Sequence, residues 1–191
     1  SGNSPVGADW FELTNTGTST LDITGWKVDD SSNSFASALA LNGISSIAAG
    51  QSVVFIEGSA TTANSFISNW FGASAPANFA IGYYSGSGIG LSANADAVNI
   101  YNGSGALQAN VSFGASDITS PYQTFDNAAG LNNTLISQLS ITGTNGAFVA
   151  SGSGYEIGSP GLVAAVPEPK TYALFLTGLA LLGFASRKRL G

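Results

Sequence analysis

The chain of 191 residues contains no cysteine, no histidine and no methionine. Without cysteine it can form no disulfide bond, no thiolate metal site and no thiol nucleophile. Without histidine it lacks the side chain that most often serves as a general base in enzymes. The usual forms of nucleophilic catalysis are therefore absent, and only carboxylate pairs remain as the basis for an acid–base site.

Positive charge is scarce as well, and it is unevenly distributed. Lys and Arg together number five, against eleven Asp and Glu. Residues 1–165 hold ten acids and one base, Lys27, for a net charge of −9, whereas residues 166–191 carry +3. Because so acidic a body is repelled by phosphate backbones, we expect no nucleic-acid partner.

Short apolar segments separated by glycine-rich turns recur along residues 9–161. Such spacing, at intervals of 8 to 12 residues, indicates an all-β sandwich or barrel. In residues 9–15, Trp10 is expected on one face of a strand, with Phe11 and Leu13 on the other. Further strands are expected near residues 25–30, 35–41, 44–47, 52–57, 81–84, 97–101, 106–113, 134–141 and 146–150, the last of them closing the series.

Two segments carry distinct local signals. In residues 63–71 the aromatic and apolar residues fall at helical spacing, which predicts a short helix capped by Thr62 or Asn64 and ended by Gly72. We expect its aromatic side chains to plug the end of the sandwich. Asn102 and Gly103 predict a tight hairpin turn with positive φ between residues 97–101 and 106–113.

The order of these motifs resembles that of the lamin-tail domain. The resemblance rests on residues 10–15, 21–26, the turn at 49–51 before the strand at 53–56, the helix near Phe66, the hairpin at 96–101 and the closing residues 158–161. It implies an all-β, immunoglobulin-like β-sandwich with one short helix, which we place at residues 1–161. The family has no agreed catalytic residues to transfer to this sequence.

The C-terminal residues have the order of a membrane anchor. Residues 172–185 are apolar and uncharged and are followed by the basic residues Arg187, Lys188 and Arg189. We expect a single transmembrane helix with its basic end in the cytoplasm. Fourteen residues span only about 21 Å as a helix, whereas a bilayer core is about 30 Å thick. The predicted helix is therefore shorter than a full membrane span, which is consistent with a temporary membrane anchor.

A stiff box precedes the apolar segment in the linker at residues 162–171. It consists of Val166, Pro167, Glu168 and Pro169. The box, the helix and the basic end together resemble a PEP-CTERM sorting signal, which implies recognition by an exosortase, a membrane protease that cuts near the box. Such a signal requires export, so we expect a signal peptide to have been removed before Ser1 and an inner-membrane precursor to be passed to the cell surface or the extracellular matrix.

Candidate metal and catalytic residues are few, and no cofactor is expected. Asp29 and Asp30 offer oxygen ligands of the kind that calcium takes, and Asp96 and Asp117 can join them only if the fold brings them near. Since these aspartates lack the spacing of a calcium-binding loop, we favour a polar loop without metal. Glu12 lies among apolar residues and is expected to accept structural hydrogen bonds.

Lys27, between Trp26 and Val28, is expected to be a solvated strand residue rather than a catalytic base. Taken together, the features favour an exported, non-enzymatic structural or adhesive protein of the envelope, matrix or biofilm. Its partners would be the exosortase and then exopolysaccharide or further copies of itself. One alternative is a calcium-dependent module that binds exopolysaccharide through the Asp29–Asp30 loop. Another is a secreted hydrolase with a carboxylate pair.

Overall fold

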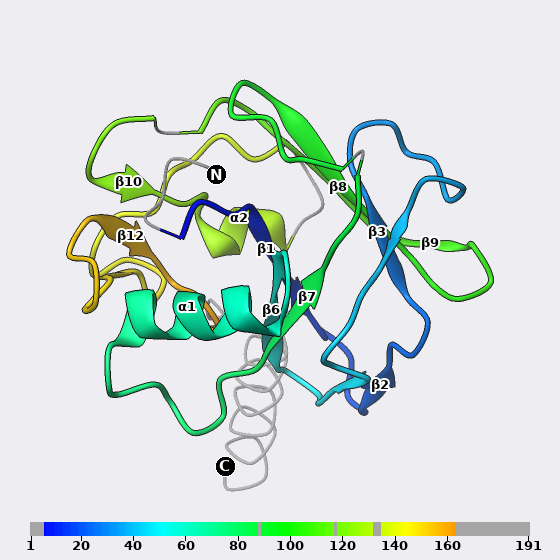
Figure 1. Cartoon of the computed structure of the whole chain (residues 1–191), viewed down its shortest axis with the longest axis horizontal. Coiled ribbons are helices and arrows are strands. Elements are labelled where there is room, and N and C mark those ends of the chain that lie inside the picture. Colours follow the sequence, from blue (N-terminus) through cyan, green and yellow to red (C-terminus); the bar gives the residue numbers. More distant parts are fainter. Residues whose placement is uncertain (1–5, 88, 117, 132–134, 163–191) are drawn as a thin grey trace, which may run out of the picture.

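A three-stranded sheet forms the centre of the fold in the computed structural model, which describes residues 6–87, 89–116, 118–131 and 135–162 (Figure 1). Its strands are β1 (Trp10–Thr14), β6 (Ser52–Glu57) and β7 (Ile81–Tyr84), in the order β1-β6-β7. β1 and β6 are antiparallel, with Phe11 opposite Phe55. β7 runs parallel to β6 because α1 lies between them in the chain and makes the crossover.

A four-stranded antiparallel sheet faces this central sheet. Its strands are β4 (Leu39–Ala40), β3 (Lys27–Asp29), β8 (Asp96–Tyr101) and β9 (Leu107–Phe113), in the order β4-β3-β8-β9. The short pair β2 (Leu21–Asp22) and β5 (Ser46–Ile47) adds a small antiparallel ladder. The central sheet and the four-stranded sheet therefore form the two layers of a sandwich, as the sequence predicts.

The main core lies between the two sheets. Phe11 and Phe55 from the central sheet pack with Val28 and Ile100 from the facing sheet and with Trp26, which precedes β3, and all five are buried. The rings of Phe11 and Phe55 are stacked with their centroids 5.7 Å apart. Alternation along β1 directs Phe11 and Leu13 into this core and Trp10 to the opposite face, as predicted.

Helix α1 (Ala60–Phe71) covers the other face of the central sheet. Its stripe of aromatic residues forms a second core, in which Phe66 and Trp70 make edge contacts with the ring of Trp10. The aromatic side chains pack into a core, as predicted, but against the outer face of the central sheet and not at the end of the sandwich. The predicted cap is wrong, because the helix begins three residues earlier at Ser59 and Thr62 lies inside the first turn, where its hydroxyl accepts the Ser59 N–H at 3.2 Å.

The end of α1 follows the prediction. Gly72 caps the helix with φ 58° and its N–H donates to the Ser68 carbonyl oxygen. Glycine adopts this left-handed backbone without the steric cost that a Cβ would bring.

A third sheet closes the described fold beside α1. It contains β10 (Tyr122–Gln123), β12 (Glu156–Gly158) and β11 (Phe148–Val149), in the order β10-β12-β11, and α2 (Asn127–Gly130) follows β10. β10 and β12 are parallel, and β11 and β12 are antiparallel. Phe148 joins this sheet to the second core through an edge contact with Trp70. The predicted segment 146–150 is therefore not the last strand, because β12 follows it.

Two further local predictions need correction. In the segment predicted as a strand at 134–141, the described residues 135–141 make only the isolated bridges Phe113–Ile136 and Phe125–Leu139. In the hairpin between β8 and β9, the positive φ falls at Gly105 (85°) and not at the Asn-Gly pair. The Asn102 side-chain oxygen accepts three hydrogen bonds, from the Ser104 N–H, the Ser104 hydroxyl and the Ala106 N–H. These bonds fix a loop that is wider than a two-residue turn.

The transmembrane helix predicted at 172–185 lies outside the described residues. Within the described part of the chain, no helix combines the length and apolar character needed to cross a bilayer.

Candidate functional site

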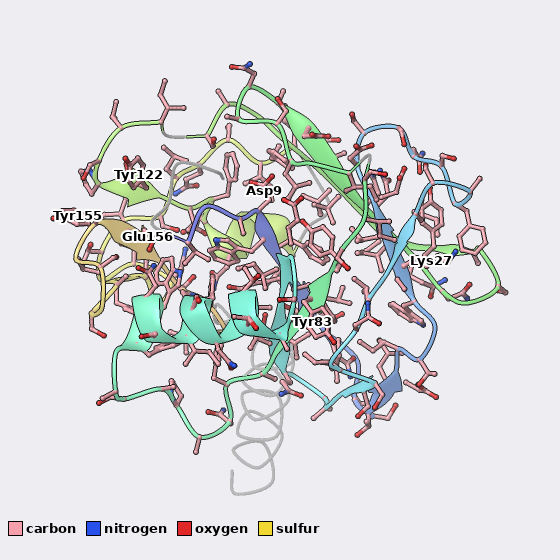
Figure 2. All side chains as sticks on the ribbon, in the orientation of Figure 1. Asp9, Lys27, Tyr83, Tyr122, Tyr155 and Glu156 are labelled. Atoms are coloured by element: carbon pink, nitrogen blue, oxygen red, sulfur yellow. The ribbon has the colours of Figure 1, made fainter. Side chains whose placement is uncertain are left out.

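A cavity of about 260 Å³ lies along β1, on the side away from β6. Residues of β8 and β9 form one wall, and residues of β10, α2 and β12 form another. In Figure 2, Tyr122 and Glu156 lie on one side of the molecule and Asp9 lies near its centre, and all three line the cavity, while Lys27 lies on the opposite side. The cavity thus joins elements that are far apart in the sequence.

The walls of this cavity are mainly apolar, and the charged residues in its described lining are all acidic. The apolar side chains include Val98, Ile100, Val111, Phe113, Phe125 and Ile136. The acidic residues are Asp9, Glu12, Asp126 and Glu156, and no lysine or arginine is found among the described lining residues. An environment of this kind disfavours carboxylate charge unless each group has a hydrogen-bond donor.

Glu12 has two such donors. The Ser52 hydroxyl donates to Oε2 at 2.8 Å, and the Gly161 N–H donates to Oε1 at 3.2 Å. The structural hydrogen bonds predicted for Glu12 are therefore present. Burial raises the pKa of Glu12 to about 8, and these two bonds lower it by less than burial raises it. At neutral pH most molecules hold a protonated Glu12 that connects β1 to the closing residues.

Asp126 and Glu156 are buried carboxylates with other partners. The Asn145 side-chain amide donates to both oxygens of Asp126, at 3.1 and 3.0 Å, and the Ala128 N–H donates to Oδ1. Glu156 accepts a bond from the Asn69 amide of α1 and a longer one from the Ser153 hydroxyl. These two groups stabilise the packing of the third sheet.

The sequence did not single out Asp126, Glu156 or Asp9 for this cavity. Asp9 accepts the Leu91 N–H at 2.9 Å, although 82 residues separate the two in the chain. No local pattern identifies acids that meet only through such distant contacts. The nearest local signal is an apolar neighbourhood around a carboxylate, which marks Glu12 clearly.

The loop that starts at Asp29 is the other predicted candidate. Asp29 is fully buried and accepts bonds from the Ser32 hydroxyl at 2.7 Å, the Ser34 N–H at 2.6 Å and the Ser37 hydroxyl at 3.1 Å. Asp30 accepts the Ser32 N–H, which closes the same turn. Both carboxylates therefore hold the loop in shape.

The fold does bring Asp96 to this loop. Its carboxylate accepts the Ser31 N–H at 3.0 Å, and also the Ser92 and Ala97 N–H groups. The three bonds from backbone groups lower the pKa of Asp96 against the opposing effect of burial, which is the largest single influence. Asp117 lies outside the described residues. Among the residues described, no group of three acids is arranged to hold a metal ion.

Lys27 is a partly buried residue of β3 whose ammonium lies 4.6 Å from the centroid of the Phe35 ring. A cation over an aromatic face is attracted by the ring quadrupole, which explains the position of this base. The predicted sorting residues, Val166 to Pro169 and Arg187 to Arg189, lie outside the described residues.

Two facing sheets with a helix over one outer face define an immunoglobulin-like β-sandwich. The family model for the Lamin Tail Domain matches residues 1–115, and the chain belongs to this family. The PEP-CTERM protein-sorting motif matches residues 165–189. Neither the curated proteins nor the solved structures contain a significant match to the chain.

These matches establish the two resemblances seen in the sequence. The Lamin Tail Domain match covers β1 to β9, so β10, α2, β11 and β12 lie beyond it. The sorting motif indicates an exported protein that is anchored in a membrane before an exosortase processes it.

Proposed function

We propose that this protein is a non-enzymatic structural or adhesive component of the cell surface or extracellular matrix. The observation that carries the proposal is the pairing of a Lamin Tail Domain with a PEP-CTERM motif in one chain. The domain provides a rigid body and the motif delivers it outside the cell. The body occupies residues 1–161, the linker 162–171 and the membrane helix with its basic end 172–191.

The hydrogen bonds of the acidic residues support a structural role. Asp29 and Asp126 are almost fully buried, with exposed fractions of 0% and 3%, and each carboxylate accepts several bonds from loop donors. Groups held in this way stabilise loops and do not need to change partner. The surface that contacts the partner is then formed by the uncharged residues that dominate the composition.

Processing of the tail tests the sorting part of the proposal. Pro167→Ala and Glu168→Gln should each leave full-length precursor in the inner membrane, since the exosortase reads the box and not only the apolar segment. Val163→Ala, just outside the matched motif, is the matched control and should be processed normally. The measurement is the intact mass of the protein in membrane and surface fractions. Surface protein that still contains residues 172–189 would contradict the sorting role.

The calcium-dependent alternative is tested separately. If the Asp29–Asp30 loop binds exopolysaccharide through calcium, a chelator should release the protein from the matrix and lower its melting temperature. A structural or adhesive protein of the kind proposed should remain bound and fold equally well after chelation.

One observation favours a hydrolase as the second candidate. Glu12 carries a raised pKa in a cavity that other carboxylates also line, as acid–base catalysts often do. Both of its oxygens, however, accept bonds from the protein itself. Glycan turnover that disappears in Glu12→Gln would establish the hydrolase, whereas unchanged glycan profiles with wild-type protein support the structural role.

A further inference from the structure

Along β1, alternate residues direct their backbone N–H and C=O groups either to β6 or to the cavity. In the β1–β6 ladder, the Glu57 N–H donates to Asp9 O at 2.8 Å and the Asn15 N–H donates to Gln51 O at 2.9 Å. Hydrogen-bonded and non-hydrogen-bonded pairs alternate in an antiparallel ladder. Residues 9, 11, 13 and 15 therefore direct their backbone groups to β6.

The alternate residues Trp10, Glu12 and Thr14 direct their backbone N–H and C=O groups away from β6. All three residues line the cavity, and β1 is the outer strand of its sheet. Among the residues that the structure describes, no backbone bond to the three outward-facing N–H or C=O groups is found. The result is an open strand edge of three residues whose outward groups repeat about every 6.8 Å, two residues at ~3.4 Å each.

One apolar wall lies along this edge. Val111 and Phe113 of β9 continue into Phe125 and Ile136, because Ile136 is bridged to Phe113 and the rings of Phe113 and Phe125 are 5.4 Å apart. The cavity reaches solvent at Ser92, an exposed residue that lines it. Its volume of about 260 Å³ limits the ligand to a short segment of chain and excludes a folded domain.

The polar groups of the cavity indicate the charge of its ligand. Asn127 Oδ1 is buried and has no hydrogen-bond partner within the described part of the chain. Asp126 and Glu156, whose carboxylates accept bonds from uncharged donors, make the polar side of the cavity acidic, and its described lining includes no lysine or arginine. A ligand that brings N–H donors and a positive side chain would satisfy both features.

We propose that the open edge of β1 binds an extended peptide segment of a partner polypeptide, which adds to the sheet as a strand. Trp10, Glu12 and Thr14 supply the backbone bonds, and alternate side chains of the peptide pack against the apolar wall. The peptide carries a lysine or arginine toward the acidic end of the cavity. This site is independent of the sorting motif, so either can fail without the other.

The test uses the full chain and a blocked seven-residue probe peptide of alternating valine and threonine with one central lysine. The probe should bind in titration calorimetry at concentrations below about 1 mM, which corresponds to roughly 4 kcal/mol. An analogue methylated on alternate backbone nitrogens cannot form the edge bonds and should bind more than about tenfold more weakly. An analogue with a central glutamate should also bind more weakly by about tenfold.

Amide hydrogen exchange locates the bound peptide. The amides of Trp10, Glu12 and Thr14 should exchange rapidly in the free protein and become protected when the probe binds. The amides of Phe11 and Leu13 already bond to β6 and should not change. This alternating pattern is specific to strand addition at β1 and would not arise from binding elsewhere on the surface.

Two variants of one residue complete the test. Thr14→Pro removes one outward N–H while leaving the ladder to β6 intact, so it should weaken probe binding about fivefold. Thr14→Val retains that N–H and is the matched control. Binding without alternating protection on β1 overturns the proposal. Protection of all three outward amides in the peptide-free chain overturns it as well, because the edge is then already covered; neither observation requires a variant to fold.

Discussion

Replacement of Glu12 by glutamine should change how the stability of the protein depends on pH. The ordinary pKa of this carboxyl group is 4.5, and in the fold it is about 8. The raised pKa contributes stability that is complete below about pH 4.5 and is lost as the pH rises through about 8. Within that window the folded state holds one more proton than the unfolded state, so the free energy of unfolding falls by about 1.4 kcal/mol per pH unit.

The wild-type protein should therefore lose about 3 kcal/mol between pH 5 and 7.5. At 2–4 °C per kcal/mol, the melting temperature should fall by about 10 °C. Glu12→Gln keeps an oxygen acceptor for Ser52 or Gly161 but cannot ionise. It should melt close to the wild type at pH 5, stay nearly constant with pH, and become the more stable protein by pH 8.

Thermal melts followed by circular dichroism at pH 5, 6, 7 and 8 measure this effect. The chain has no histidine, the side chain that ordinarily titrates in this range, so the slope reports few other groups. Asp22→Asn is the control, because hydrogen bonds from Thr24 lower the pKa of Asp22 and confine its effect to acid pH. Parallel curves for the wild type and Glu12→Gln would refute the reasoning.

Three further predictions follow from the packing and the loops. Asp29→Ala should lower the free energy of unfolding by at least about 2 kcal/mol, because three loop donors lose their acceptor. A chelator should not change the melting temperature of the wild type, and a large drop would show calcium dependence. Gly82→Ala should lower the free energy of unfolding, measured with denaturant, by about 1–3 kcal/mol, because its Cβ would lie 2.5 Å from the Phe55 ring. Gly90→Ala is the control and should be nearly neutral, because the space around Gly90 is open. Residues 1–165 expressed without the tail should show a β-type spectrum and one cooperative transition; a disordered spectrum would contradict the domain assignment.

The sequence predicted the elements whose signals are local. The strand at 52–57 agrees with β6, and the alternation at β1 placed Trp10 and Phe11 on the correct faces. The aromatic spacing after residue 62 identified α1 and its buried side, because four apolar positions at helical spacing fix one face. These features depend on period and side-chain type, both of which can be read from neighbouring residues.

The remaining features depend on contacts between distant residues. The parallel pairing of β6 with β7 and of β10 with β12 leaves no signal in either strand alone. Residues 135–141 have strand-like composition, but they make only isolated bridges because their neighbours are irregular segments. The cavity could not be predicted for the same reason: its walls come from both ends of the described chain.

The exit of the chain from the fold explains how a sorting tail can be removed without loss of structure. The Gly161 N–H donates to Glu12, and the Asn127 amide donates to Leu162 O at 2.6 Å. The ring of Phe79 lies against Gly161 so closely that a Cβ there would come within 2.6 Å of it. Pro167 is five residues beyond Leu162 in the sequence. A cut near the sorting box therefore falls outside these contacts, and the first strand keeps its bond to the closing residues before and after processing.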